Sequence, residues 1–317
     1  MDYDRTGKWI MIGQVTKSTG SWYEVKTEAG ETLQARLRGK FRIKGLKVNN
    51  PIAVGDWVEL EKEEANKEAA LITDILDRKN YIIRKSTRKN GFSHILASNI
   101  DQALLVATLS FPRTSLGFID RFLVSAESFR IPSMIVFNKQ DLMTEEDIEH
   151  CHLLMEMYKS LGYGAYLISA EKETGLGELL KELQGKSTLI AGHSGVGKST
   201  LMNKLIPGLS LKTGKVSSFA NKGTHTTTFA EMFEINNDSK IIDTPGIKEL
   251  GLVDMESTEI SHYFPEMRDY LGQCKYHNCT HTNEPHCAVL EAIIAGEIAD
   301  SRFNSYLSIL EDYDSHR

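Results

Sequence analysis

The chain has 317 residues, of which 41% are apolar and 25% charged, and its formal net charge is −6. The length allows two or three domains, and the composition is that of an ordinary globular protein. The negative balance argues against a protein that simply coats nucleic acid. No apolar run approaches the roughly 20 residues that span a bilayer, and the polar N-terminus has no apolar signal core. We therefore predict no membrane segment and a cytoplasmic location.

The N-terminal region predicts a small β-barrel. Five short segments with strand patterns lie between residues 7 and 77, with turns at Gly20, Gly30 and Gly55. Five strands in about 70 residues are typical of an OB-fold. Residues 1–90 carry a net charge of +5 and the remainder −11, so we expect a polyanion contact at this end of the chain.

A cationic residue stands at every second position from residue 36 to residue 44, along one edge of the segment if it is extended. These residues are Arg36, Arg38, Lys40, Arg42 and Lys44. One interpretation is contact with an RNA phosphate backbone, with Trp22, Tyr23 or Phe41 near enough to stack on bases. The alternative is a solvated loop with ordinary surface charge.

Strand and helix patterns alternate from about residue 98 to residue 250. Continuous apolar runs, typical of strands buried on both faces of a parallel sheet, occupy 100–109, 133–138, 165–169 and 188–192. Helical spacing occupies 117–129, 144–161, 175–184 and 199–206, and two further strands are expected at 228–235 and 240–246. The alternation predicts an α/β domain with a mainly parallel sheet covered by helices.

A phosphate-binding pattern, G-x-x-x-x-G-K-[ST], follows the strand at 188–192. Its glycines let backbone N–H groups turn toward phosphate oxygens, and the following helix adds its partial positive charge. We expect Lys198 to reach the outer phosphates and Ser199 to bind Mg²⁺. A purely structural glycine turn is the alternative, which the strand before and the helix after disfavour. The predicted phosphate-binding residues are Gly192, His193, Ser194, Gly195, Val196, Gly197, Lys198, Ser199 and Thr200.

Two further segments complete the phosphate half of a GTPase site. Asp243 ends an apolar strand and is expected to hold Mg²⁺ through a water, while Gly246 gives its N–H to the terminal phosphate. Between the two motifs, one of three threonines can place a hydroxyl on Mg²⁺ when the third phosphate is present. We select Thr227 from Thr226, Thr227 and Thr228, and the alternative is a polar surface loop.

The base-recognition motif N-K-x-D occupies 138–141. The Asp141 carboxylate can accept hydrogen bonds from guanine N1–H and its 2-amino group, neither of which adenine offers. Lys139 is expected to lie over the ring and Asn138 to brace the loop. The backbone N–H groups of Ser169 and Ala170 lie near the guanine oxygen in this prediction. The motif's full set is Asn138, Lys139, Gln140 and Asp141.

The order of these motifs is unusual, because an ordinary GTPase has its phosphate loop first and its base-recognition motifs last. Joining old termini and opening another loop preserves a compact domain when the termini lie close together. The sequence therefore predicts a circularly permuted GTPase in which two distant halves of the chain bind one nucleotide. The segment after Asp243 leads almost directly into the C-terminal region.

The motif order and the cysteine pattern resemble the RsgA type, a family of permuted GTPases in bacterial small-ribosomal-subunit maturation. The resemblance covers nearly the whole chain. It implies an OB-fold RNA-binding domain at 1–80, a circularly permuted GTPase domain at 81–255 and a zinc-binding helical domain at 256–317. It also implies cytoplasmic GTP hydrolysis, slow alone and stimulated by the small subunit. The expected partners are the small ribosomal subunit, its rRNA, GTP and GDP, and the chain is expected to be a monomer.

Three of the four cysteines lie within 14 residues, which favours a metal over a disulfide in a reducing compartment. His277 and His286 are rival ligands within this region, and Cys151 is left over as a buried thiol. Three thiolates and one imidazole suit a closed, structural Zn²⁺ site. The ligand set that the resemblance implies is Cys274, Cys279, His281 and Cys287.

Catalysis is the least determined part of the sequence. Many GTPases place Gln just after D-x-x-G to orient the attacking water, but Ile247 stands here, so we expect weak intrinsic hydrolysis. The resemblance implies His225 as the substitute, with Lys198 as the second catalytic residue. A solvated loop histidine is the alternative.

Two other functions compete with a GTPase that assists subunit maturation. One is an RNA-binding module gated by GTP with negligible turnover. The other is a metabolic kinase with a phosphate-binding loop, which the N-K-x-D motif and the lack of an evident acceptor site disfavour.

Overall fold

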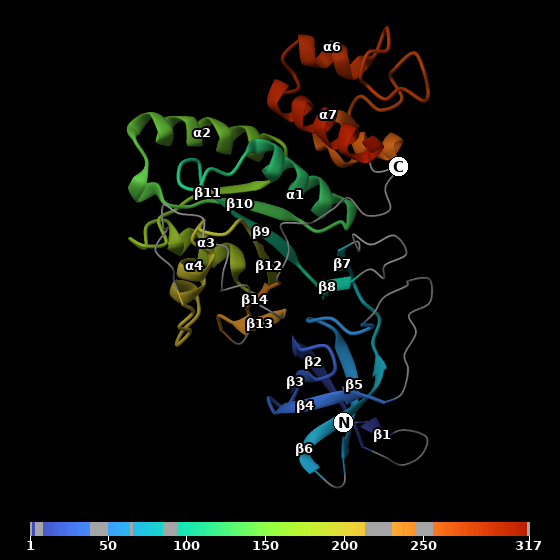
Figure 1. Ribbon diagram of the computed structural model, residues 1–317, viewed down its shortest axis with the longest axis vertical. Helices are drawn as coiled ribbons and strands as arrows, with labels where there is room; N and C mark the ends of the chain where they lie inside the picture. Colours follow the sequence, from blue (N-terminus) through green and yellow to red (C-terminus); the bar gives the residue numbers. More distant parts are fainter. Residues whose placement is uncertain are drawn as a thin grey trace. The chain divides into compact units, whose positions relative to one another are not determined.

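The computed structural model describes residues 2–3, 9–38, 50–63, 66–84, 94–212, 230–236, 238–244 and 256–315. The chain forms two compact units. The first comprises residues 1–104, 177–191 and 198–249. The second comprises residues 105–176, 192–197 and 250–317. Figure 1 labels the strands and most of the helices of both.

A closed five-stranded barrel forms the N-terminal part of the first unit, drawn in blue in Figure 1. Its strands are β2 (Trp9–Ser18), β3 (Tyr23–Thr27), β4 (Thr32–Leu37), β5 (Trp57–Glu63) and β6 (Asn66–Ile75). The strand order is β2-β3-β4-β6-β5, and β5 pairs back with β2 to close the barrel. A two-residue strand, β1 (Asp2–Tyr3), pairs with β2. The prediction of an OB-like barrel is confirmed.

Alternation of apolar and polar residues explains why these segments form a barrel. In β4, Leu33 and Ala35 are buried while Arg36 is exposed, as expected when successive side chains point to opposite faces. Gly13 in β2 allows β3 to approach closely, because a Cβ there would lie 2.7 Å from Val25 Cγ1. The interior is filled by Val15, Val25, Leu33, Val58, Leu60 and Ile72.

The first unit also contains strands of the α/β sheet. β12 (Ser187–Ala191) is parallel to β14 (Lys240–Asp243), and β13 (Glu231–Glu234) is antiparallel to β14. β13 also meets β2 of the barrel, where Glu231 pairs with Lys17 in the ladder and through an ion pair of 2.9 Å. Helices α3 (Leu176–Leu183) and α4 (Lys198–Leu205) flank β12 in the sequence.

An antiparallel pair, β7 (Tyr81–Arg84) and β8 (His94–Ser98), was not predicted. It precedes β9 (Gln102–Ala107), which is buried along its whole length and runs from the first unit into the second. The full burial of β9 agrees with the continuous apolar run in its sequence.

The second unit continues the predicted alternation with the parallel strands β10 (Ser133–Phe137) and β11 (Gly164–Leu167). Helix α1 (Leu116–Ser128) precedes β10, and α2 (Glu145–Ser160) follows it. Thr144 caps the N-terminus of α2 and forms a capping box with Asp147. The C-terminal elements are η3 (Ser257–Tyr263), α5 (Pro265–Arg268), α6 (Ala288–Ile294) and α7 (Asp300–Ser315). Val124 of α1 packs in one buried cluster with residues of these elements, including Ile260, Met267 and Ile309.

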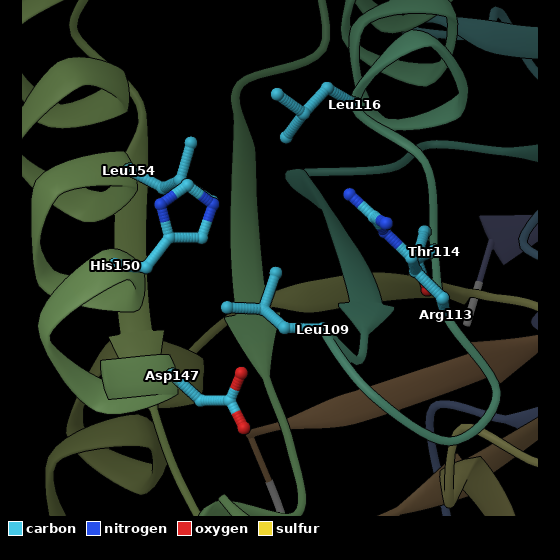
Figure 2. Close-up of a pocket in the computed structure, with 7 residues that line it drawn as sticks. All are labelled: Leu109, Arg113, Thr114, Leu116, Asp147, His150 and Leu154. Atoms are coloured by element: carbon cyan, nitrogen blue, oxygen red, sulfur yellow. The ribbon is translucent and has the colours of Figure 1, made fainter. Parts of the chain in front are cut away.

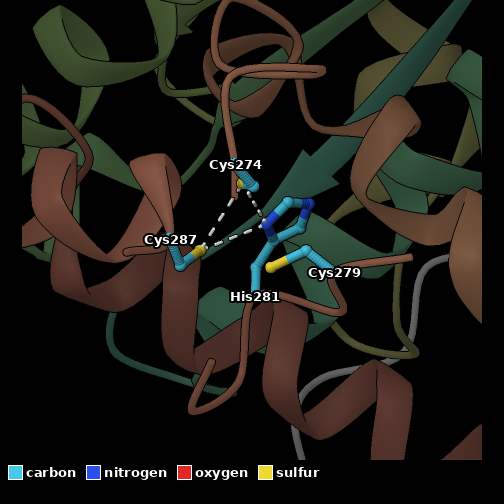
Figure 3. Close-up of side chains that lie close together, drawn as sticks. All are labelled: Cys274, Cys279, His281 and Cys287. Atoms are coloured by element: carbon cyan, nitrogen blue, oxygen red, sulfur yellow. Dashed lines mark hydrogen bonds between the residues drawn. The ribbon is translucent and has the colours of Figure 1, made fainter. Parts of the chain in front are cut away.

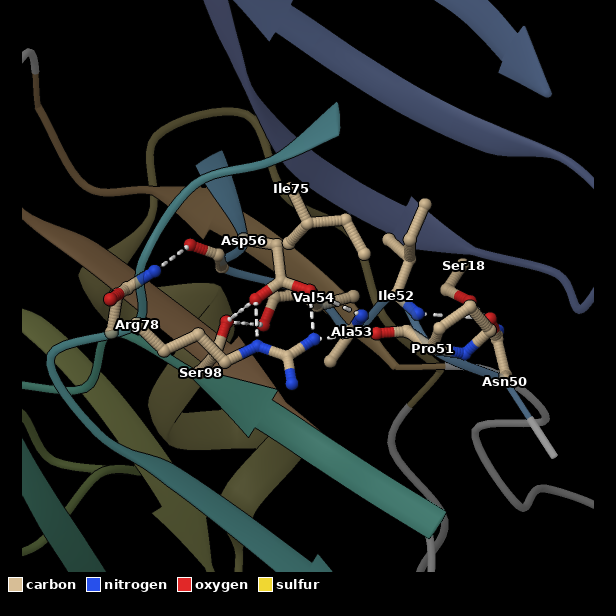
Figure 4. A network of polar contacts seen from close by, with 12 residues as sticks. Ser18, Asn50, Pro51, Ile52, Ala53, Val54, Asp56, Ile75, Arg78 and Ser98 are labelled. Carbon is tan, nitrogen blue, oxygen red and sulfur yellow. Dashed lines mark hydrogen bonds and ion pairs between the residues drawn. The ribbon is translucent and has the colours of Figure 1, made fainter. Parts of the chain in front are cut away.

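A buried ion pair between Asp56, just before β5, and Arg78, after β6, is joined to β8 by a hydrogen bond within the first unit (Figure 4). Asp56 is fully buried, and its carboxylate accepts hydrogen bonds from Arg78 at 2.6 Å and from Ser98 Oγ at 2.5 Å. The backbone N–H of Ala53 donates to the same carboxylate at 2.8 Å, and Arg78 also donates to the carbonyl of Pro51. Together these hydrogen bonds offset the free-energy cost of removing the charges of Asp56 and Arg78 from water.

Replacing Asp56 by Asn should lower the free energy of unfolding by about 3–5 kcal/mol, because the Arg78 charge then lacks its buried counter-ion. Urea denaturation of the full chain measures the loss. Glu31→Gln is the matched control, because Glu31 and Lys62 form an ion pair that is nearly half exposed. That pair contributes about 0–1 kcal/mol. Equal losses in the two variants would contradict the role of the Asp56 pair.

Candidate functional site

The base-recognition motif begins where β10 ends, at the carboxyl edge of the sheet. The Asn138 backbone N–H donates to the carbonyl of Ala107 at the end of β9. Its side chain is 2% exposed and bridges two other segments. Nδ2 donates to the carbonyl of Val196 at 2.8 Å, and Oδ1 accepts from the N–H of Ala170 at 2.9 Å. One amide therefore connects N-K-x-D, the phosphate loop and the Ser169-Ala170 segment, all within the second unit.

Lys139 makes a second connection to the phosphate loop. Its backbone is left-handed, with φ +70°, and its Nζ donates to the carbonyls of Gly195 at 2.6 Å and Phe111 at 2.7 Å. Burial lowers the pKa of Lys139, and the Asp141 carboxylate opposes that shift. The carbonyl of Phe111 is a contact that the sequence did not indicate, because any residue type presents a carbonyl.

Asp141 lies in the short helix η1 (Gln140–Leu142) and its carboxylate is held by a hydrogen bond from Ser169 Oγ. Ser169 and Ala170 are each 1% exposed, whereas Asp141 is exposed. The N–H of Gln140 donates to the carbonyl of Ile168 at 3.0 Å, which fixes the base-recognition motif against the end of β11. This arrangement orients an exposed carboxylate that retains free acceptor capacity.

Three glycines shape the phosphate loop. Gly192, Gly195 and Gly197 have φ values of +146°, +85° and +96°, which L side chains rarely adopt. A Cβ on Gly197 would lie 2.3 Å from Asn138 Nδ2, and one on Gly192 would lie 2.4 Å from the carbonyl of Val106. Both the backbone conformation and the close approach therefore require glycine at these positions.

The residues predicted to act on Mg²⁺ and the outer phosphates belong largely to the first unit. Asp243 is the last residue of β14, is 8% exposed, and lies opposite Ile190 in the register of β14 with β12. The strand that leads into the phosphate loop therefore neighbours the strand that ends in Asp243. Lys198 and Ser199 begin α4, with Thr200 next in the same helix. The predictions for His225, Thr226, Thr227, Thr228, Gly246 and Ile247 lie outside the described residues.

A cavity of about 220 Å³ lies between the loop after β9 and helix α2 (Figure 2). Leucines 109, 116 and 154 line its apolar part, and Figure 2 shows Arg113 and His150 pointing into it from opposite sides. Its lining, completed by Thr114 and Asp147, includes none of the predicted GTP-binding residues. Because the two sets of residues do not overlap, the cavity is distinct from the predicted nucleotide site, and it is smaller than the 300–1,000 Å³ that is usual for ligand pockets.

The four predicted metal ligands converge in the C-terminal part of the second unit (Figure 3). The ligand atoms of Cys274, Cys279, His281 and Cys287 all lie within 4.8 Å of one another. His281 is therefore the histidine of this cluster rather than His277 or His286, and Cys151 is buried in α2 as predicted.

The distances fit tetrahedral zinc. Bonds of 2.3 Å to sulfur and about 2.05 Å to nitrogen place two sulfurs about 3.8 Å apart and a sulfur and a nitrogen about 3.6 Å apart. The Sγ atoms of Cys274 and Cys287 are 3.8 Å apart. His281 Nδ1 lies 3.5 Å from Cys274 Sγ and 3.3 Å from Cys287 Sγ. Burial also lowers the pKa of His281, which favours the neutral imidazole that ligates metals.

The predicted RNA-contacting segment is described only in part. Arg36 and Arg38 are exposed, and Arg38 forms an ion pair with Glu61 at 3.0 Å. The predictions for Lys40, Arg42, Lys44 and Phe41 lie outside the described residues. Of the aromatic residues proposed to stack on bases, Trp22 is 45% exposed.

The proposal for Tyr23 was wrong. Its side chain is 1% exposed in the barrel interior, and its hydroxyl donates to Asn50 Oδ1 at 2.6 Å. Its position at the start of β3 directs it inward, because neighbouring residues of a strand face opposite sides.

The position of N-K-x-D before the phosphate loop, together with the contacts between the two motifs, defines the class of this protein as a circularly permuted GTPase. The chain belongs to the RsgA GTPase family. The family model described as RsgA GTPase matches residues 75–253, and that of the RsgA N-terminal domain matches residues 12–71.

Relatives and solved structures agree with this assignment. The small ribosomal subunit biogenesis GTPase RsgA of Cytophaga hutchinsonii is 54% identical over 307 residues, covering 97% of this chain and all of the relative. The crystal structure of YjeQ from Thermotoga maritima is 36% identical with a TM-score of 0.77, covering 96% of this chain and 98% of that one. YloQ, described as a circularly permuted GTPase, is 28% identical with a TM-score of 0.74, covering 100% and 99%.

Replacing Cys279 by Ser should reduce the metal held by this cluster from about one ion per chain to a small fraction, because a hydroxyl is a much poorer ligand than a thiolate for such a site. Elemental analysis of the purified full-length protein measures the stoichiometry. Cys151→Ser is the matched control, since Cys151 lies in α2 outside the Cys₃His cluster. Loss of the metal in both variants, or in neither, would contradict the assigned ligand set.

Proposed function

We propose that this chain hydrolyses GTP to assist late maturation of the small ribosomal subunit, slowly alone and faster when bound to the subunit. The observation that carries the proposal is the Asn138 amide, which joins the phosphate loop to the base-recognition motif. A guanine nucleotide has its base and its phosphates at opposite ends, so joining these two motifs positions both contacts for one ligand. The names of the close relatives support the role in subunit biogenesis.

Base recognition is assigned to Asp141, with Lys139 over the ring, Asn138 and Gln140 supporting the motif, and the N–H groups of Ser169 and Ala170 toward the guanine oxygen. The phosphates are assigned to residues 192–200 and to Gly246. Mg²⁺ is assigned to Ser199, Thr227 and Asp243, because P-loop hydroxyls and a strand-end aspartate hold it in this class. Lys198 neutralises charge on the outer phosphates, and His225 orients the attacking water in place of the missing glutamine.

The remaining regions are assigned to partner binding and structure. The barrel domain at 1–80 contacts ribosomal RNA through Arg36, Arg38, Lys40, Arg42 and Lys44. The GTPase domain spans 81–255, and the helical domain at 256–317 holds one structural Zn²⁺. None of the helices in the described part of the chain combines the length and apolar composition that a membrane span requires. We place the protein in the cytoplasm as a monomer.

Asp141→Asn should reduce GTP affinity at least a hundredfold and raise affinity for xanthosine triphosphate. Guanine donates from its 2-amino group to a carboxylate, whereas xanthine presents a carbonyl at that position, which accepts from an asparagine amide. Competition against a fluorescent GDP analogue measures both affinities. Glu146→Gln is the control, because it neutralises an exposed carboxylate in the first turn of α2. An unchanged preference for guanine in Asp141→Asn would reject the assigned base contact.

Purified small subunits should raise the GTP turnover of the full-length chain at least tenfold, whereas large subunits should not. His225→Ala should keep GTP affinity and lose that stimulation. Turnover with each subunit, and sedimentation with GDP, GTP and a non-hydrolysable analogue, measure these effects. Binding to the small subunit that depends on GTP, with no turnover under any condition, would favour the alternative of a GTP-gated RNA-binding module. Stimulated turnover that His225→Ala leaves intact would reject the role of His225.

A further inference from the structure

Helix α1 contacts two different parts of the second unit through residues on opposite sides. Phe118 and Asp120 are two positions apart, which turns them about 200° from one another around the helix axis. Phe118 contacts the phosphate loop, and Asp120 contacts the C-terminal helices. Because the two side chains share one turn of backbone, a displacement at either contact moves the other.

On the first side, Phe118 packs against His193 of the phosphate loop. The two ring centroids are 3.8 Å apart with planes tilted by 34°. The N–H of Phe118 donates to the side chain of the N-cap residue Ser115 at 3.3 Å, which fixes the start of the helix. His193 occupies the first variable position of G-x-x-x-x-G-K-S, directly after Gly192, so the aromatic contact acts on the entry to the loop.

On the second side, Asp120 is fully buried and accepts three hydrogen bonds. The donors are Arg302 Nη1 at 2.7 Å, Ser305 Oγ at 2.5 Å and Tyr158 Oη at 2.9 Å. Two of these donors lie in α7 and the third in α2. A fully hydrogen-bonded buried carboxylate strongly resists movement, because loss of any partner leaves a charge incompletely compensated.

Arg302 extends this network to α5. It donates to both carboxylate oxygens of Glu266, from Nε at 2.6 Å and from Nη2 at 3.2 Å, and its guanidinium lies 4.7 Å from the Phe264 ring centroid. It is completely buried. Tyr306, which also lies in α7, donates a hydrogen bond to the backbone carbonyl of Thr280 at 2.6 Å. Thr280 stands between the predicted metal ligands Cys279 and His281 in the sequence. Helix α7 therefore contacts both α1 and the loop that carries the metal ligands.

We propose that Phe118 and Asp120 are positioning residues, which hold the phosphate loop in its nucleotide-binding conformation by fixing α1 between His193 and helix α7. This inference rests on the proposed GTP site. Neither residue touches the nucleotide in this proposal. Their effect is confined to the loop that receives the β-phosphate, and it is separate from recognition of the base by N-K-x-D.

The test compares affinities for GDP and GMP, because GMP keeps the base and lacks the β-phosphate that the loop N–H groups receive. Phe118→Leu should weaken GDP binding about three- to tenfold, the range expected for one aromatic pair, and change GMP binding less than about twofold. Phe118→Tyr retains the ring and should restore GDP affinity. Affinities are measured on the full-length, zinc-loaded chain by competition with a fluorescent GDP analogue.

Phe122→Leu is the matched control for stability, since Phe122 is a buried phenylalanine one turn further along α1. It should leave the ratio of GDP to GMP affinity unchanged. Tyr158→Phe removes one donor to Asp120 and should weaken GDP binding about twofold. In the Phe118→Leu background it should have no further effect, because residues that act through one element are not additive.

The outcomes separate this inference from the proposed function. If wild type binds GDP and Phe118→Leu binds it equally well, or if Phe118→Leu weakens GDP and GMP alike, the inference is overturned and the GTP site stands. If the effects of Tyr158→Phe and Phe118→Leu on GDP affinity add fully in the double variant, the role of Asp120 is overturned. If the wild-type chain binds no guanine nucleotide, the proposed function fails and the inference falls with it.

Discussion

The contact between the base-recognition motif and the phosphate loop depends on one buried side-chain amide, that of Asn138. Asn138 donates to the phosphate loop and accepts from Ala170, so three loops at the carboxyl edge of a parallel sheet are connected through a single side chain. This connection is important in a permuted chain, because the base-recognition motif precedes the phosphate loop by more than fifty residues in the sequence. Covalent proximity cannot hold the two motifs together, so noncovalent contacts must. Lys139 adds a second contact to the same loop, and the glycines leave space for both.

The C-terminal region depends on a different set of constraints. Its helices in the described part of the chain are short, apart from α7, and a small module buries a smaller share of its surface on folding than a large one does. Its buried cluster includes Val124 of α1, and its residue Arg302 forms a buried ion pair with Asp120 of the same helix. The Cys₃His cluster ties the loops before α6 at distances that suit a tetrahedral metal. The contacts with α1 therefore extend the small core of this region.

Much of the fold and of the candidate site could be predicted from sequence because each rests on a local pattern. The barrel strands alternate, the α/β strands are continuously apolar, and the site motifs stand at strand ends. The prediction that Tyr23 stacks on bases failed because a local pattern does not identify the buried face of a strand. Strand alternation specifies two faces, and only the closed barrel shows which face is interior. The β7–β8 pair was missed because two short segments separated by a charged stretch carry little periodic signal.

The sequence by itself determined the permuted class, the candidate contacts for guanine and phosphate, and the cysteines of the metal cluster, since each depends on residue types at fixed spacings. Tertiary structure alone decided that Asn138 bridges two distant loops and that Arg302 lies against Asp120. These contacts join residues separated by up to 182 positions. No local pattern encodes such a pairing, because it arises only when packing brings the chain segments together and burial makes an unpaired polar group costly.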